Sequence, residues 1–214
     1  MERLAFAARI REGQKDKLRT LLGKEWKEIT SLLDELNVTN FSIWNAADMV
    51  FVYGEAPDGF AVSGAQMEAA KKLAGSFDAA LEWLCGPGER MRLMYEDFGI
   101  VRTDKSLIRH RMFMTKLKDG CAEEYKHRHD GLIAARGGVP DPGPDSNFSI
   151  WSDGTYIFGY DEIDTTMETE ETPEAHENTV AWETRQLGIM DWITDDVDWL
   201  TGEKHARSIR LAWH

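Results

Sequence analysis

Apolar side chains occupy every second position near the start of the chain, from Leu4 to Ile10. This period of two predicts a strand with one covered face. After a turn at Gly13 the apolar spacing changes to three and four residues: Leu18, Leu21, Leu22, Trp26, Ile29, Leu32, Leu33 and Leu36. That spacing predicts an amphipathic helix of several turns, ending near Asn37.

The pattern then returns to short β-rich runs at residues 41–44 and 49–53, separated by residues 45–48 in a predicted hairpin. Helical spacing follows and predicts a second helix through Met67, Ala70, Leu73, Ala74, Phe77, Leu81 and Leu84. Residues 86–88 (Gly-Pro-Gly) should end this helix before a last strand at residues 91–98. The predicted order is β-α-β-β-α-β.

The chain repeats itself at an offset of 107 residues. The sequence Asn-Phe-Ser-Ile-Trp occurs unchanged at residues 40–44 and 147–151, and the same offset places Phe6 on Phe113 and Tyr53 on Tyr160. Two units follow, residues 1–102 and 108–214, joined by the polar stretch 102–106. The pattern is that of a duplication, because there are two copies and not a longer array.

Each predicted unit has the element order of a ferredoxin-like fold, in which two helices cover one face of a four-stranded antiparallel sheet. The second face of each sheet also needs a cover. We therefore predict an α+β protein of two tandem ferredoxin-like units, packed sheet to sheet as a pseudo-dimeric α/β barrel.

Composition narrows the possible partners. The 214 residues are 42% hydrophobic, enough to bury a substantial core, and the formal net charge is -13. A strongly acidic chain disfavours nucleic acid and anionic membrane surfaces and leaves a small neutral molecule as the preferred partner. With no signal-peptide pattern at the N-terminus and no long apolar run, we expect a cytoplasmic protein, either a monomer with an internal pseudo-dimer or a homodimer.

The two copies differ at positions expected to face the space between helix and sheet. All six histidines lie in the second copy. Tyr125 and His129 stand where the first copy has leucines 18 and 22, one helical turn apart on the same face. On the neighbouring strand, Arg111 replaces a leucine and Thr115 replaces an alanine. Four polar groups in an apolar layer require either a hydrogen-bonded network or a wet pocket, because each costs roughly 1 to 3 kcal/mol if unpaired.

Other residues of the second copy are weaker candidates. Tyr156 replaces a methionine on the partner strand, and the faces of Trp182 and Trp192 are suited to stacking on a sugar, although core packing is usual for tryptophan. The Pro/Gly-rich segment 137–146 cannot continue a helix, so it is either a pocket rim or a surface connection. The acidic segment 161–177 fits no calcium-loop spacing, and we expect no metal and no cofactor.

Residues 111–151 resemble the L-rhamnose mutarotase family, whose small ferredoxin-like members interconvert the anomers of a free sugar. The resemblance rests on Glu-Glu-Tyr at 123–125, Arg-His-Asp at 128–130, the motif at 147–151 and the run at 157–163. It implies that Tyr125 and His129 are the catalytic pair, and it adds Asp130 and Trp151 to the expected substrate-binding positions. The family's Arg-Trp-Trp motif on the second helix has no clear counterpart here.

We therefore expect a cofactor-free isomerase that opens and recloses the ring of a rhamnose-like aldose by general acid/base catalysis. A barrel oxygenase or cyclase acting on an aromatic or polyketide substrate is the enzymatic alternative. The non-enzymatic alternative is a barrel that binds a small molecule without catalysis. A pocket lined by hydroxyl groups and imidazole would favour the sugar, and one lined by aromatic side chains alone would favour the polyketide.

Overall fold

The computed structural model describes residues 1–86, 89–140, 142–194 and 208–214. It shows an α+β protein with two five-stranded antiparallel sheets and, within the described residues, four helices. The chain forms two compact units, residues 1–91 with 209–214 and residues 92–208. None of the described helices is long and apolar enough to span a membrane.

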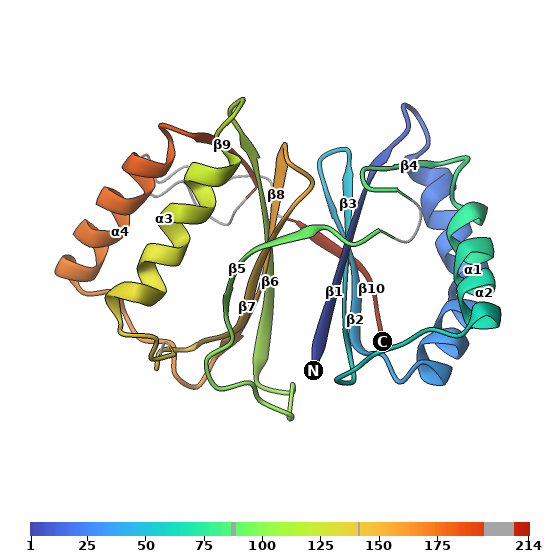
Figure 1. Ribbon diagram of the computed structural model, residues 1–214, viewed down its shortest axis with the longest axis horizontal. Coiled ribbons are helices and arrows are strands. Elements are labelled where there is room, and N and C mark those ends of the chain that lie inside the picture. The colour runs from blue at the N-terminus through green and yellow to red at the C-terminus, as the bar shows by residue number, and fades with distance from the viewer. Residues whose placement is uncertain (87–88, 141, 195–207) are drawn as a thin grey trace. The chain divides into compact units, whose positions relative to one another are not determined.

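Unit one contains the sheet β10-β2-β3-β1-β4. Its elements are β1 (Glu2–Ile10), α1 (Lys15–Glu35), β2 (Thr39–Ala46), β3 (Met49–Ala56), α2 (Gly64–Ser76), β4 (Leu81–Trp83) and β10 (Ile209–Trp213). Figure 1 shows both helices on one face of this sheet.

Unit two contains the sheet β5-β7-β8-β6-β9. Its elements are β5 (Arg92–Asp97), β6 (Ile108–Leu117), α3 (Ala122–Ala135), β7 (Asp145–Ser152), β8 (Tyr156–Asp164), α4 (Pro173–Gln186) and β9 (Met190–Thr194). Its two helices again cover one face of the sheet (Figure 1).

The edge strands β5 and β10 are exchanged between the two repeats. We expected the strand at residues 91–98 to complete the first copy, but β5 pairs with β7 in unit two. In return, β10 from the end of the second copy pairs with β2 in unit one. The boundaries of the compact units, after residues 91 and 208, therefore differ from the expected division into residues 1–102 and 108–214.

The other elements of the first copy follow the sequence pattern closely. Helix α1 ends at a cap formed by Leu36, and Asn37 then takes a left-handed conformation, so the predicted end of this helix is confirmed. The hairpin between β2 and β3 is also confirmed.

The second helix was predicted too long. Helix α2 ends at Ser76, whose hydroxyl bonds back to the carbonyl of Leu73, and Leu81 belongs to a short strand paired with β1. Apolar spacing alone cannot distinguish a longer helix from a helix followed by a short strand, because a few apolar residues after a helix fit a buried strand equally well. Of the expected Gly-Pro-Gly stop, residues 87 and 88 lie outside the described residues.

The repeated motif at residues 40–44 and 147–151 has the same structure twice. Asn40 and Asn147 both have positive φ, 48° and 51°, at an irregularity in the pairing of β2 and of β7. Each side-chain amide donates to a buried glutamate, Glu55 at 2.9 Å and Glu162 at 3.1 Å. Asparagine tolerates the left-handed region better than most residues, so the motif builds a β-bulge and has a structural role.

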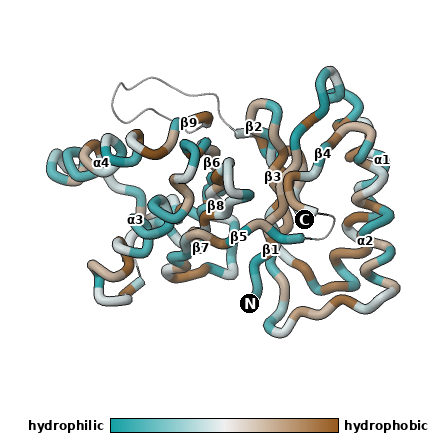
Figure 2. Tube along the Cα trace, turned by 45° about the horizontal axis from the view of Figure 1, so that its top comes forward, coloured by the Kyte–Doolittle hydropathy of each residue, from teal (hydrophilic) through white to brown (hydrophobic). Residues whose placement is uncertain are grey.

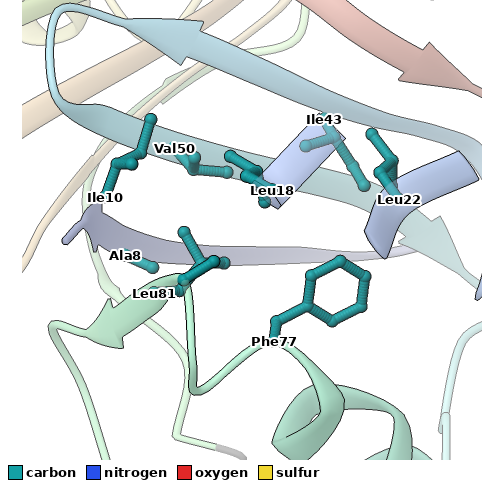
Figure 3. Close-up of a cluster of buried hydrophobic side chains, with 9 residues drawn as sticks. Ala8, Ile10, Leu18, Leu22, Ile43, Val50, Phe77 and Leu81 are labelled. Carbon is teal, nitrogen blue, oxygen red and sulfur yellow. The ribbon is translucent and has the colours of Figure 1, made fainter. Parts of the chain in front are cut away.

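The core of unit one lies between its helices and its sheet. Figure 3 shows Leu18 and Leu22 of α1 facing Ile43 and Val50 of the sheet, with Phe77 beside them. Apolar and polar segments alternate along α1 in Figure 2, as expected for an amphipathic helix. In unit two the corresponding layer holds Phe113, Tyr125, Ile150 and Ile157.

Candidate active site in unit two

Helix α3 places Tyr125 and His129 on the sheet-facing side of unit two, where the helical spacing predicted them. The exposed fractions of the two residues are 2% and 6%. Their rings stack with centroids 4.1 Å apart, as i and i+4 positions on a helix allow. The predicted pair is therefore a contact in the structure, but it lies deeper than the wall of an open pocket would.

A backbone hydrogen bond determines which nitrogen of His129 carries the proton. Nδ1 lies 2.8 Å from the carbonyl oxygen of Tyr125, and a carbonyl only accepts, so Nδ1–H is the donor. In the neutral ring Nε2 then keeps its lone pair, and it has no hydrogen-bond partner among the described residues. Burial lowers the pKa of His129 to about 4, so the imidazole is a neutral base at pH 7.

Aromatic rings surround His129 on three sides. Besides Tyr125, the ring of Tyr95 lies 5.4 Å away and that of Trp182 lies 5.3 Å away, both edge to face. Trp182 was predicted at this site, whereas Tyr95 was not. Tyr95 lies on the exchanged strand β5, and nothing in the local sequence indicates which sheet that strand joins.

A carboxylate joins the same cluster from α4. Glu183 is 9% exposed, and its Oε2 accepts a hydrogen bond from the indole nitrogen of Trp192 at 3.0 Å. Burial first, and the charge of Glu183 second, raise the pKa of the Tyr125 hydroxyl, which therefore stays protonated. Glu183 was missed from the sequence, although its place beside Trp182 and three residues before Gln186 puts all three on one helical face.

Two buried polar side chains complete the layer. Thr115 is fully buried and lies beside Trp192 of β9 in the strand register. Its hydroxyl, and both amide atoms of Gln186, have no hydrogen-bond partner among the described residues. Unpaired buried polar groups are costly, so these three atoms stand out within the layer.

Arg111 lies on the same face of β6 but joins a different cluster. Its guanidinium is 3.9 Å from the carboxylate of Asp161 on β8 and packs over the ring of Phe113. Asp161 is 2% exposed, and one of its oxygens has no hydrogen-bond partner in the described structure. Burial, and then the nearby charge of Asp145, raise the pKa of this carboxyl group.

Three other predicted binding residues lie apart from the pair. Tyr156 pairs with Lys116, so it projects from the face of the sheet opposite Thr115. Trp151 alternates with Ile150 in the same way, and its indole nitrogen donates to Ser149. Asp130 is on the exposed side of α3 in an ion pair with Lys126. Within unit two, these three residues therefore do not lie in one cluster with His129.

Among the other described histidines, His110 contacts Tyr160, His176 contacts Glu171 and His214 contacts Asp34. The Pro/Gly-rich segment is non-helical where it is described, with α3 ending at Ala135 and positive φ at Gly137 and Gly138, as predicted. Residue 141 of this segment and His205 lie outside the described residues. In the part of the chain that is described, no three His, Cys, Asp or Glu side chains are grouped to hold a metal ion.

A cavity lies in unit one, where we did not expect one. Its volume is about 400 Å³, and it lies in unit one between the sheet and helices α1 and α2. A second hollow is lined by residues 101–104, 107–108 and 164. Neither of these two has Tyr125 or His129 among its lining residues.

Comparisons with models of protein families, with curated proteins and with solved structures find no match to this chain.

Proposed function

We propose that unit two catalyses the interconversion of sugar anomers by ring opening, without a cofactor. The observation that carries this proposal is the neutral His129, whose Nδ1–H is held by the Tyr125 carbonyl so that the basic Nε2 is left without a protein partner. A base that already has its tautomer fixed needs no rearrangement before it accepts a proton.

The chemistry requires one proton to move between two oxygens of the sugar. Nε2 of His129 takes the proton of the anomeric hydroxyl while the bond between the anomeric carbon and the ring oxygen breaks. The imidazolium then returns that proton to the ring oxygen, giving the open aldehyde. Reclosure on the other face gives the second anomer, and the protein ends in its starting state.

Tyr125 and the aromatic side chains have supporting roles in this proposal. The hydroxyl of Tyr125 stays protonated, so it can donate a hydrogen bond to the ring oxygen as negative charge develops there. The faces of Trp182 and Tyr95, which enclose His129, can pack against the apolar side of a pyranose. The unpaired groups of Thr115 and Gln186 are available for sugar hydroxyls.

We also propose that each unit has a ferredoxin-like fold. The sheet order β2-β3-β1-β4 with two helices on one face supports a ferredoxin-like description of unit one, and β7-β8-β6-β9 supports it for unit two. The fifth, exchanged strand of each sheet is an addition to that pattern. The packing of the two sheets against each other stays a prediction, as does the membership of the mutarotase family.

Anomer exchange measured by NMR exchange spectroscopy tests the proposal directly. A panel of free aldoses that includes L-rhamnose is compared with and without protein. We expect acceleration for at least one sugar, and a loss of about 10²- to 10⁴-fold in His129→Asn, which keeps a donor near the Nδ1 position but lacks the base. Tyr125→Phe should show a smaller loss, because it removes only a hydrogen bond.

His127→Asn is the matched control, since it makes the same change on the exposed side of the same helix. It should leave the exchange rate unchanged. If the parent protein accelerates no aldose, or if His129→Asn keeps the full rate, the mutarotase proposal fails. The oxygenase or cyclase and the binding barrel would then remain as alternatives.

A further inference from the structure

Helix α2 of unit one has an apolar face but buries none of its residues. Met67, Ala70, Leu73 and Ala74 recur at helical spacing, yet none of them is fully buried. The helix is well formed, because Ser63 and Gln66 make a complete capping box at its start. Its apolar face therefore points at a space that protein atoms do not fill.

That space is the cavity of about 400 Å³ between α1, α2 and the sheet. Interiors of proteins contain few voids larger than a water molecule. An engineered apolar cavity of about 150 Å³ stays dry and binds benzene. The cavity of unit one is more than twice that size and falls within the range of about 300 to 1,000 Å³ that is usual for ligand sites.

The walls of the cavity are hydrocarbon. Most lining residues are aliphatic or aromatic, among them Leu18, Leu22, Ile43, Val50 and Phe77, which Figure 3 shows on the helix and sheet sides. Such walls give no hydrogen bonds to hold water or a sugar in place. The occupant must therefore be apolar.

The rim gives no reason to expect a charged ligand. Four charged residues line the cavity, two cations and two anions: Lys71, Arg90, Asp78 and Glu89. All four are exposed, and Arg90 is already paired with Glu2 at 3.0 Å. The charges cancel and stay in water, so they do not select an anion or a cation.

We propose that unit one binds a small, uncharged apolar molecule in this cavity. This inference is independent of the sugar chemistry proposed for unit two, because all lining residues belong to unit one. The duplicated chain would then carry two different sites, one polar and one apolar, at the same place in the two copies.

The fluorescent probe N-phenyl-1-naphthylamine, which is uncharged and apolar, tests the proposal on the full chain. We expect saturable binding at one site per chain and a rise in the melting temperature with probe concentration. The double variant A70L/A74L fills the cavity from α2 and should weaken probe binding by about tenfold or more. A69L makes the same change at an exposed position outside the lining and should stay within about twofold of the parent.

Methyl NMR of the unaltered protein gives a readout that needs no variant. Shifts on probe addition should be confined to lining methyl groups such as those of Leu22, Ile43 and Val50. The proposal is overturned by the absence of saturable binding, by shifts elsewhere, or by undiminished binding to a folded A70L/A74L. His129→Asn should bind the probe normally, which separates this result from that of the anomer-exchange experiment.

Discussion

A group of three apolar positions in unit one has become three charged residues in unit two. At the repeat offset, Leu4, Val38 and Gly54 correspond to Arg111, Asp145 and Asp161. Val38 lies close to Gly54, 3.2 Å from where a Cβ would be, and belongs with Leu4 to one apolar cluster. In unit two Arg111 lies 3.9 Å from Asp161, and the charge of Asp145 contributes to the raised pKa of Asp161.

The charge on Asp161 should destabilise the protein as the pH rises. Its folded-state pKa is raised above the ordinary value near 4, so the folded state binds more protons between these two pKa values, and stability falls across that window. Asp161→Asn removes the charge and keeps the shape. We expect the variant to gain about 1 to 3 kcal/mol relative to the parent between pH 4 and pH 8, measured by urea unfolding.

Asp130→Asn is the control for this effect. Asp130 is half exposed and pairs with Lys126 on the surface of α3, so its removal should change stability by no more than about 0.5 kcal/mol. A loss of stability in Asp161→Asn at pH 8 would mean that the ion pair with Arg111 outweighs the cost of burial.

His129 should make stability depend on pH in the opposite direction. Its folded-state pKa, about 4, lies below the ordinary 6.5, so the unfolded state takes up the proton first as the pH falls. The contribution of His129 to the free energy of unfolding is fully present above pH 6.5 and is lost progressively between pH 6.5 and about pH 4. Below pH 4 this contribution no longer changes with pH. The loss should be at most about 3 kcal/mol and should be absent in His129→Asn.

The difference between the parent and His129→Asn, followed by urea unfolding from pH 4 to pH 7, isolates this contribution from other acid-sensitive groups. A midpoint near 6.5 in the folded protein, seen by NMR titration of the imidazole, would show that the ring is solvated. If anomer exchange is detected, its rate should fall with acid around pH 4 for the same reason.

At the scale of single elements, strand β10 connects the end of the chain to helix α1 and strand β2 of unit one. The backbone of His214 makes two hydrogen bonds of 2.8 Å with Phe41, and its side chain contacts Asp34 at 2.9 Å. Arg210 lies over the ring of Trp44, 5.6 Å from its centroid. Six residues that follow unit two in the sequence therefore stabilise unit one.

Deletion of residues 209–214 should weaken unit one selectively. The change removes an edge strand with several main-chain hydrogen bonds, each worth about 0.5 to 1.5 kcal/mol, so amide hydrogens of β2 should exchange faster than in the parent. Amides of β7 and β8 should keep their protection. Trp213→Ala, which truncates a half-exposed side chain but keeps the strand, is the control.

The sequence pattern was sufficient for most elements of the first copy, but it assigned β4 to the end of a helix, and it was insufficient for the pairing of the strands. Period-two alternation shows which residues of a strand share a face, and it placed Phe113 and Thr115 together correctly. It does not show which strand lies alongside, and so it could not reveal that β5 brings Tyr95 to His129. Cavity volume was equally hidden, because it depends on how far α2 stands from the sheet.

At the scale of the whole molecule, the peptide chain passes between the two units twice, after Met91 and after Ser208. A duplicated protein whose copies were simply joined in series would have one such passage. Here each copy gives its last strand to the sheet of the other, so neither copy contains all the residues of a unit. The two repeats are therefore interdependent for folding, although each unit has its own core.

A cut between residues 91 and 92 shows what this double passage means. It would give two fragments, of which 1–91 lacks β10 and 92–214 carries it. The longer fragment would hold a strand that belongs in the sheet of the shorter one, so neither could satisfy that sheet edge alone. The chain is thus a natural candidate for fragment complementation, in which two separately made pieces regain the fold only when they are mixed.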